Sequence, residues 1–220
     1  MAVIHDTTLK PTKLELLASW LPTRPWYVGT SAPALTRTGG FRLDDPEGEV
    51  GIEFMVATDA SGADPVNYLV PLTYRGAPLE GAEKALVGTM EHGVLGPRWA
   101  YDGAHDPVLV AQLLALIEGR VQAQAQSLTD TPDHEVARSY AGDGLPSGDW
   151  PMTATDDAEY GTRLPHRGGA TLRIHRVLRP TAPDTAPPGA IGHVIGAWQS
   201  PDDTRARAVF ASLHPAAHQL

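Results

Sequence analysis

The chain has 220 residues, enough for one large domain or two small ones with a substantial hydrophobic core. Its net charge is −9, from 26 acidic and 17 basic residues, so the average surface repels phosphate backbones and anionic lipid, and we expect no nucleic acid and no membrane partner. Zero cysteines exclude disulfides, iron–sulfur sites and thiol nucleophiles.

The composition and the N-terminus narrow the class of protein further. A content of 22 Gly and 20 Pro with 42% hydrophobic residues favours many short elements over a helical bundle. No segment approaches the roughly 18 to 20 consecutive apolar residues of a membrane span. The start MAVIHDTTLKP lacks the basic-then-apolar layout of a signal peptide, so we expect a cytoplasmic protein.

The first elements expected are a helix and three antiparallel strands. Residues 10–22 favour an amphipathic helix with Pro11 in its first turn, ended by Pro22. Strands are expected at 34–43, 50–56 and 66–75.

The alternation of apolar residues in the last two of these strands predicts half-buried strands with one apolar face and one mixed face. Pro71 cannot donate to a strand ladder, so we expect the strand that contains it to lie at an edge or to be bulged.

A short meander and a strong helix start follow. Residues 84–91 and 98–101 predict two further strands. Asp106 is expected to cap a helix that has Pro107 at its first position, and Gly119 either breaks that helix or only weakens it. Its expected buried stripe is Val110, Leu113, Leu114 and Ile117.

The C-terminal part is expected to be a separate, smaller region rich in strands. Residues 127–151 are rich in Asp, Gly, Pro and Ser, with a short helical candidate at 134–140. We therefore expect a first domain over residues 1–145 and a β-rich region over 146–220. Strands are expected there at 170–178, 190–198 and 205–213.

Four segments carry a family resemblance: YLVPLTYRGAPL from Tyr68, EHGVLGPRW from Glu91, YDG from Tyr101 and HDP from His105. Together they resemble the N-terminal cap domain of bacterial maltokinases and related aminosugar kinases. The resemblance implies an α+β fold, a curved antiparallel, cystatin-like sheet with one long helix packed on it. The chain departs from the cap pattern at Gly29, which Thr30 follows where those caps have Lys.

In those kinases the cap precedes a two-lobed catalytic region, of which almost nothing is recognisable here. TLRIHRVLRP resembles a small-lobe strand, with Arg173 in the place of the nucleotide-binding lysine, so residues 146–220 are interpreted as a degenerate small-lobe remnant. The chain has no G-x-x-x-x-G-K-[ST], no Asp-Phe-Gly and no His-Gly-Asp. We therefore expect no kinase activity, no catalytic residue and no cofactor.

Candidate metal ligands lie near the end of the expected meander. His92, Asp102 and His105 could converge there with Asp106, and two imidazoles with a carboxylate would suit zinc or iron. Each also has a structural explanation, as a helix cap, a residue at the helix start or a turn residue. We expect no metal.

The mixed face of the sheet is the candidate binding surface. Glu53, Arg75 and Glu91 point to it if the alternation holds, with Trp99 and Tyr101 as aromatic anchors. The same face could instead be simply solvated.

Two functions remain open. The first is a non-catalytic interaction or regulatory module that binds another protein or a second copy, and the resemblance implies a link to α-glucan, maltose or trehalose metabolism. The alternative is a small-molecule binder for a sugar or sugar phosphate, or an unrecognised enzyme, that uses the concave sheet face.

Overall fold

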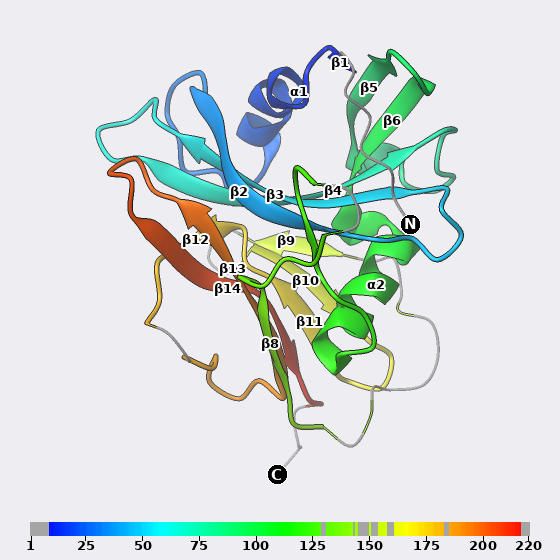
Figure 1. Ribbon diagram of the computed structural model, residues 1–220, viewed down its shortest axis with the longest axis vertical. Coiled ribbons are helices and arrows are strands. Elements are labelled where there is room, and N and C mark those ends of the chain that lie inside the picture. Colours follow the sequence, from blue (N-terminus) through cyan, green and yellow to red (C-terminus); the bar gives the residue numbers. More distant parts are fainter. Residues whose placement is uncertain are drawn as a thin grey trace.

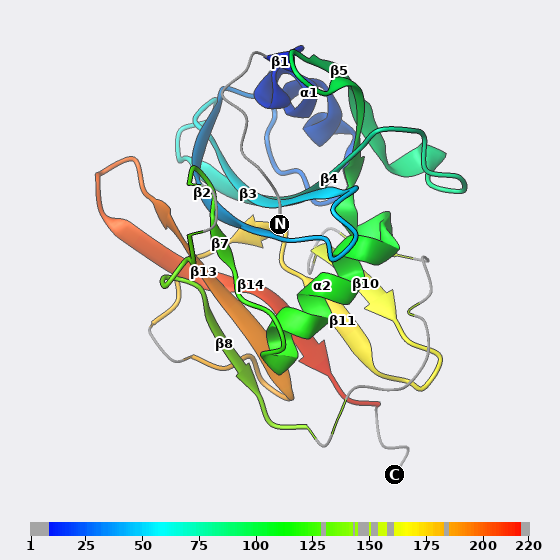
Figure 2. The same cartoon turned by 45° about the vertical axis from the view of Figure 1, so that its right-hand side comes forward.

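The computed structural model describes residues 9–128, 131–142, 144, 150, 154–157, 161–182 and 185–216. Within these ranges, fourteen antiparallel strands join into one sheet that bends over into two layers, accompanied by two α-helices (Figures 1 and 2). The expected α+β class therefore holds in its coarser form, as a mostly antiparallel sheet with helices packed on it. No described helix is long and apolar enough to cross a membrane.

The first layer has the strand order β1-β5-β6-β4-β3-β2, and the second continues from β2 as β13-β14-β11-β10-β9. The strands of the first layer are β1 (Leu9–Lys10), β2 (Leu35–Leu43), β3 (Gly51–Asp59), β4 (Val66–Arg75), β5 (Leu86–His92) and β6 (Gly96–Asp102). Those of the second are β9 (Thr155–Asp157), β10 (Gly161–Pro165), β11 (Thr171–Ile174), β13 (Gly192–Gln199) and β14 (Arg205–His214). Three short strands pair at the sides, β7 (Gln124–Ala125) with β2, β8 (Ala137–Tyr140) with β13 and β12 (Val177–Leu178) with β4.

Helix α1 (Lys13–Trp20) lies on the outer face of the first layer. Thr12 and Glu15 form a capping box, in which each side chain accepts from the other residue's backbone N–H. The helix therefore begins after Pro11, which the sequence had placed within the first turn. Pro22 lies in a 3-10 turn, Leu21–Thr23, that follows the α-helix.

Both faces of β3 are buried, because each face of the first layer packs against a different core. Phe54 and Val56 face the large core between the layers, whereas Met55 belongs to the cluster under α1 that includes Trp20 and Trp26. The prediction of a half-buried strand is therefore wrong for β3, and also for β4, in which residues 68–73 are all buried. The sequence of one strand does not reveal that a helix covers its second face.

Strand β4 is an interior strand, so the prediction of an edge or bulged strand at Pro71 is wrong. On one side β4 pairs along its length with β3, and on the other side its start pairs with β12 and its end with β6. Pro71 falls between these two partners, where no neighbouring strand requires its missing N–H.

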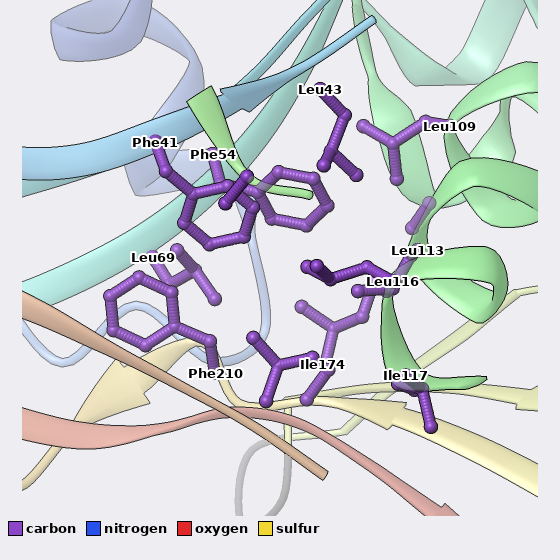
Figure 3. Close-up of a cluster of buried hydrophobic side chains, with 14 of the residues drawn as sticks. Phe41, Leu43, Phe54, Leu69, Leu109, Leu113, Leu116, Ile117, Ile174 and Phe210 are labelled. Carbon is purple, nitrogen blue, oxygen red and sulfur yellow. The ribbon is translucent and has the colours of Figure 1, made fainter. Parts of the chain in front are cut away.

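Helix α2 (Pro107–Glu118) begins and ends where the sequence places its signals. Asp106 is the N-cap and Pro107 the first residue. Gly119, with φ 81°, is the left-handed C-cap, so the helix has 12 residues and the expected long helix is not found. The side chains of α2 enter the core between the layers together with Phe41, Phe54 and Phe210 (Figure 3).

The C-terminal part differs from expectation in two places. Residues 137–140 form strand β8 and not a helix. The expected strand 170–178 is split into β11 and β12, which pair with different layers. The boundary expected at 145/146 lies outside the described residues, and the core between the layers contains residues from before and after it.

A buried ion pair lies where the chain passes from β11 to β12. Arg176, with 0% exposure, donates from one terminal nitrogen to both carboxylate oxygens of Asp102 at 2.7 Å. Its Nε donates to Thr162 Oγ1 at 2.7 Å, and its guanidinium carbon lies 5.0 Å from the ring centroid of Trp26. This one side chain therefore joins β10 of the second layer to β6 of the first.

We expect Arg176→Met to destabilise the protein by about 3–5 kcal/mol, because the substitution leaves the Asp102 carboxylate buried without its counter-charge. The double variant Arg176→Met/Asp102→Asn should recover a large part of this loss. Urea denaturation gives both free energies of unfolding. A single variant within about 1 kcal/mol of wild type would show that the pair does not hold the layers together.

Candidate interaction surface

Arg75, the expected anchor, is engaged inside the molecule. Its Nε and one terminal nitrogen donate to the two carboxylate oxygens of Asp106, each at 2.7 Å. The Asp106 side chain is fully buried and that of Arg75 is 20% exposed, and this bonding to Asp106 raises the pKa of the guanidinium. Its guanidinium therefore anchors the start of α2 and is not an exposed fork, which corrects the expectation.

The two aromatic candidates are not equally placed. Tyr101 is 2% exposed, and its hydroxyl accepts a hydrogen bond from the Leu79 backbone N–H at 2.9 Å. It belongs to a small core with Ala82 and Ala85, so the expectation of a surface anchor is wrong for Tyr101. Trp99 is half-buried against the same core and keeps part of its ring at the surface.

Glu53 is also buried, at 3% exposure, so it does not point to a solvated face. Its Oε2 accepts from Lys13 Nζ at 2.5 Å and from the Tyr74 hydroxyl at 2.7 Å, and Oε1 accepts from Gln126 Nε2 at 2.9 Å. Burial alone would raise the pKa of Glu53, but the Lys13 ammonium and these hydrogen bonds lower it below its usual value. The carboxylate is therefore charged and satisfied.

Glu91 is exposed, near the turn that joins β5 to β6. In that turn the His92 Nδ1 accepts hydrogen bonds from the backbone N–H groups of Val94 and Leu95, at 3.3 and 3.1 Å. Val94 is 59% exposed and Leu95 44% exposed. Both side chains lie in the segment EHGVLGPRW. Their exposure depends on how far the hairpin projects, so it could not be predicted from the sequence.

The candidate metal ligands are used for other purposes. Asp102 binds Arg176 and accepts from the Ala104 backbone N–H, and His92 holds the β5–β6 turn. His105 lies in a 3-10 turn, Gly103–His105, before α2. No group of three or more potential ligands gathers within the part of the chain that the structure describes.

A polar cluster that the sequence analysis did not identify lies on the second layer. Ser212 is fully buried, and its Oγ is 3.0 Å from Nε2 of both His175 and His214. Burial, followed by the charges of His214 and Arg173, lowers the pKa of His175 from 6.5 to about 4. Among the described residues no carboxylate is hydrogen-bonded to either imidazole, so the cluster lacks the third member of a serine hydrolase triad.

The lowered pKa of His175 predicts a loss of stability in weak acid. The unfolded chain takes up a proton near pH 6.5 and the folded chain only near pH 4, so folding is opposed as the pH falls through this window. For His175→Gln, we expect the fall in unfolding free energy between pH 7 and pH 4 to be smaller than in wild type by about 3 kcal/mol. The exposed His134→Gln is the matched control, and equal acid sensitivity of wild type and His175→Gln would contradict the assignment.

The Asp106–Arg75 pair gives a second prediction. Asp106 also accepts a hydrogen bond from the Val108 backbone N–H, so Asp106→Ala removes a cap and leaves Arg75 without its partner. We expect a cost of about 2–3 kcal/mol, above the ~1 kcal/mol of a lost N-cap alone. Asp106→Asn keeps a capping oxygen and should cost less than Asp106→Ala in chemical denaturation. Equal costs for the two variants would show that the cap contributes little.

The fold and this surface define a mostly antiparallel α+β domain whose charged motif residues stabilise its interior. Residues 20–106 match the family model described as the maltokinase N-terminal cap domain, which confirms the resemblance found in the sequence. The match runs from the last residue of α1 to the N-cap of α2. No kinase domain family was detected in the chain, and a search of curated proteins found no match.

Proposed function

We propose that this chain is a non-catalytic interaction module that binds a protein partner, or a second copy of itself, through the β5–β6 turn. The observation that carries the proposal is the pair Val94 and Leu95, two adjacent side chains among the five exposed large apolar ones of the described residues. In Figure 1 the hairpin rises away from the second layer, beside α1. Exposed apolar side chains at a projecting turn are suited to a pocket on a partner.

The backbone of the turn supports this role. His92 accepts from two successive N–H groups, and Gly96, with φ 70°, takes a conformation that other residues disfavour. A turn held in this way loses little conformational entropy on binding, which favours affinity. A stable contact must bury about 1,000 Å² or more, so it would extend over neighbouring residues such as Glu91 and Trp99.

The family match supports the choice of partner. A cap in a maltokinase is part of a kinase, so the proposed partner class is a kinase or another enzyme of α-glucan, maltose or trehalose metabolism. The proposal includes no catalysis by this chain itself. Its support is the sequence, in which the phosphate-holding and magnesium-holding motifs of kinases are missing.

The test replaces both apolar side chains, in Val94→Ser/Leu95→Ser. We expect the wild-type chain to self-associate in sedimentation velocity or to bind a purified maltokinase, and the variant to bind at least tenfold more weakly. Val28→Ser is the matched control, because Val28 is 55% exposed outside the hairpin. A wild-type chain that stays monomeric and binds no maltokinase, or a variant that binds equally well, would overturn the proposal.

A further inference from the structure

Two arginines of β2 lie on the face of the first layer that α1 covers. Across the β2–β3 ladder, Arg42 pairs with Glu53 and Arg37 pairs with Ala57. Directly opposed residues share a face of the sheet, and Met55, between the two partners, packs in the cluster under α1. Arg42 therefore lies opposite the buried Glu53, and Arg37 lies farther along the same face, opposite Ala57.

The charges of both arginines act on the Glu53–Tyr74 pair. Arg37 helps to lower the pKa of Glu53. Burial and the Glu53 charge raise the pKa of Tyr74 well above its usual value, and the charges of Arg37 and Arg42 both oppose that rise. The Lys13 ammonium, 4.7 Å from the Tyr74 ring centroid, adds a third cation. Three cations on this face thus act on the Glu53–Tyr74 pair.

Both oxygens of the Glu53 carboxylate already have hydrogen-bond partners, whereas neither arginine side chain has one among the described residues. Lys13, Tyr74 and Gln126 satisfy both oxygens of Glu53. Across the described ranges, no hydrogen bond or ion pair engages the side chain of Arg37 or Arg42, in contrast to the paired Arg75, Arg176 and Arg205. In a chain of net charge −9, this leaves a local excess of two positive charges.

Gly40 lies between the two arginines, opposite Met55 on the same face, and carries no side chain. Gly40 has φ 119°, and a Cβ there would lie 1.9 Å from the Phe54 carbonyl oxygen and 3.1 Å from Gln126 Nε2. Any other residue is therefore excluded, and Gln126 passes over the glycine to reach Glu53. On the face between the two arginines, Gly40 therefore presents bare backbone beside the side-chain amide of Gln126.

We propose that Arg37 and Arg42 form a binding site for the phosphate group of a small phosphorylated molecule. Arginine presents planar pairs of N–H donors that match phosphate oxygens. A phosphate monoester carries a charge near −2 at neutral pH, which balances two guanidinium groups, whereas a carboxylate balances one. The site is separate from the β5–β6 turn and goes beyond the proposed interaction role.

The test uses inorganic phosphate as the probe, in isothermal titration at pH 7.5 and constant ionic strength. We expect saturable binding to wild type and at least tenfold weaker binding to Arg37→Gln and to Arg42→Gln. The exposed Arg179→Gln is the matched control and should bind as wild type does. Acetate should bind at least tenfold more weakly than phosphate, and circular dichroism checks that each variant is folded.

The results separate this site from the hairpin. Val94→Ser/Leu95→Ser should keep its phosphate affinity, whether or not the hairpin binds a partner. Absence of saturable phosphate binding by wild type, unchanged binding in the double variant Arg37→Gln/Arg42→Gln, or acetate binding equal to phosphate would each overturn the proposal.

Discussion

The fold depends on the neutralisation of two carboxylates in the five-residue segment from Asp102 to Asp106. Asp102 is paired with Arg176 from the junction of β11 and β12, and Asp106 is paired with Arg75 at the end of β4. Each aspartate also caps a helical turn, through Ala104 N–H and Val108 N–H respectively. A buried carboxylate without a counter-charge is strongly unfavourable, so the end of β6, the start of α2 and both layers are placed relative to this segment.

This arrangement changes the meaning of the motifs that carried the family resemblance. The sequences YDG and HDP contain a tyrosine and two aspartates, which in an unknown protein invite a functional interpretation. In the structure Tyr101 bonds to the Leu79 backbone and the two aspartates bind arginines inside the molecule. The side chains of YDG and HDP therefore stabilise the domain, and a site for a partner or ligand has to be sought at other residues.

Local signals in the sequence predicted the elements well. The N-cap at Asp106 and the existence of strands β4, β13 and β14 depend on neighbours in the chain. The errors arise where a distant segment decides the environment. Burial of Glu53 requires Lys13 and Gln126, which lie 40 and 73 residues away. The pairing of Arg176 with Asp102 spans 74 residues, and no pattern around Arg176 distinguishes it from the neighbouring Arg173.

The candidate sites, like the errors in the fold, depend on contacts between segments that are distant in the sequence. The exposure of Val94 and Leu95 is a property of the assembled sheet, and so is the lack of hydrogen-bond or ion-pair partners for Arg37 and Arg42 among the described residues. The sequence alone therefore favoured Arg75 and Tyr101. Both of those residues instead form hydrogen bonds inside the molecule, Arg75 with Asp106 and Tyr101 with the Leu79 backbone. The candidate binding side chains are of common residue types. They are identified by their exposure or by their lack of partners among the described residues.

The net charge of −9 and the positive charge at Arg37 and Arg42 together favour a small anionic ligand over a large one. At physiological ionic strength charges are screened beyond about 8 Å, so a small phosphate compound at the site responds mainly to the nearest cations. A nucleic acid extends far beyond that distance and meets the acidic remainder of the surface, which repels it. The proposed site can therefore favour a small phosphorylated molecule over a polyanion, and the lack of a nucleic acid partner stays a prediction from composition.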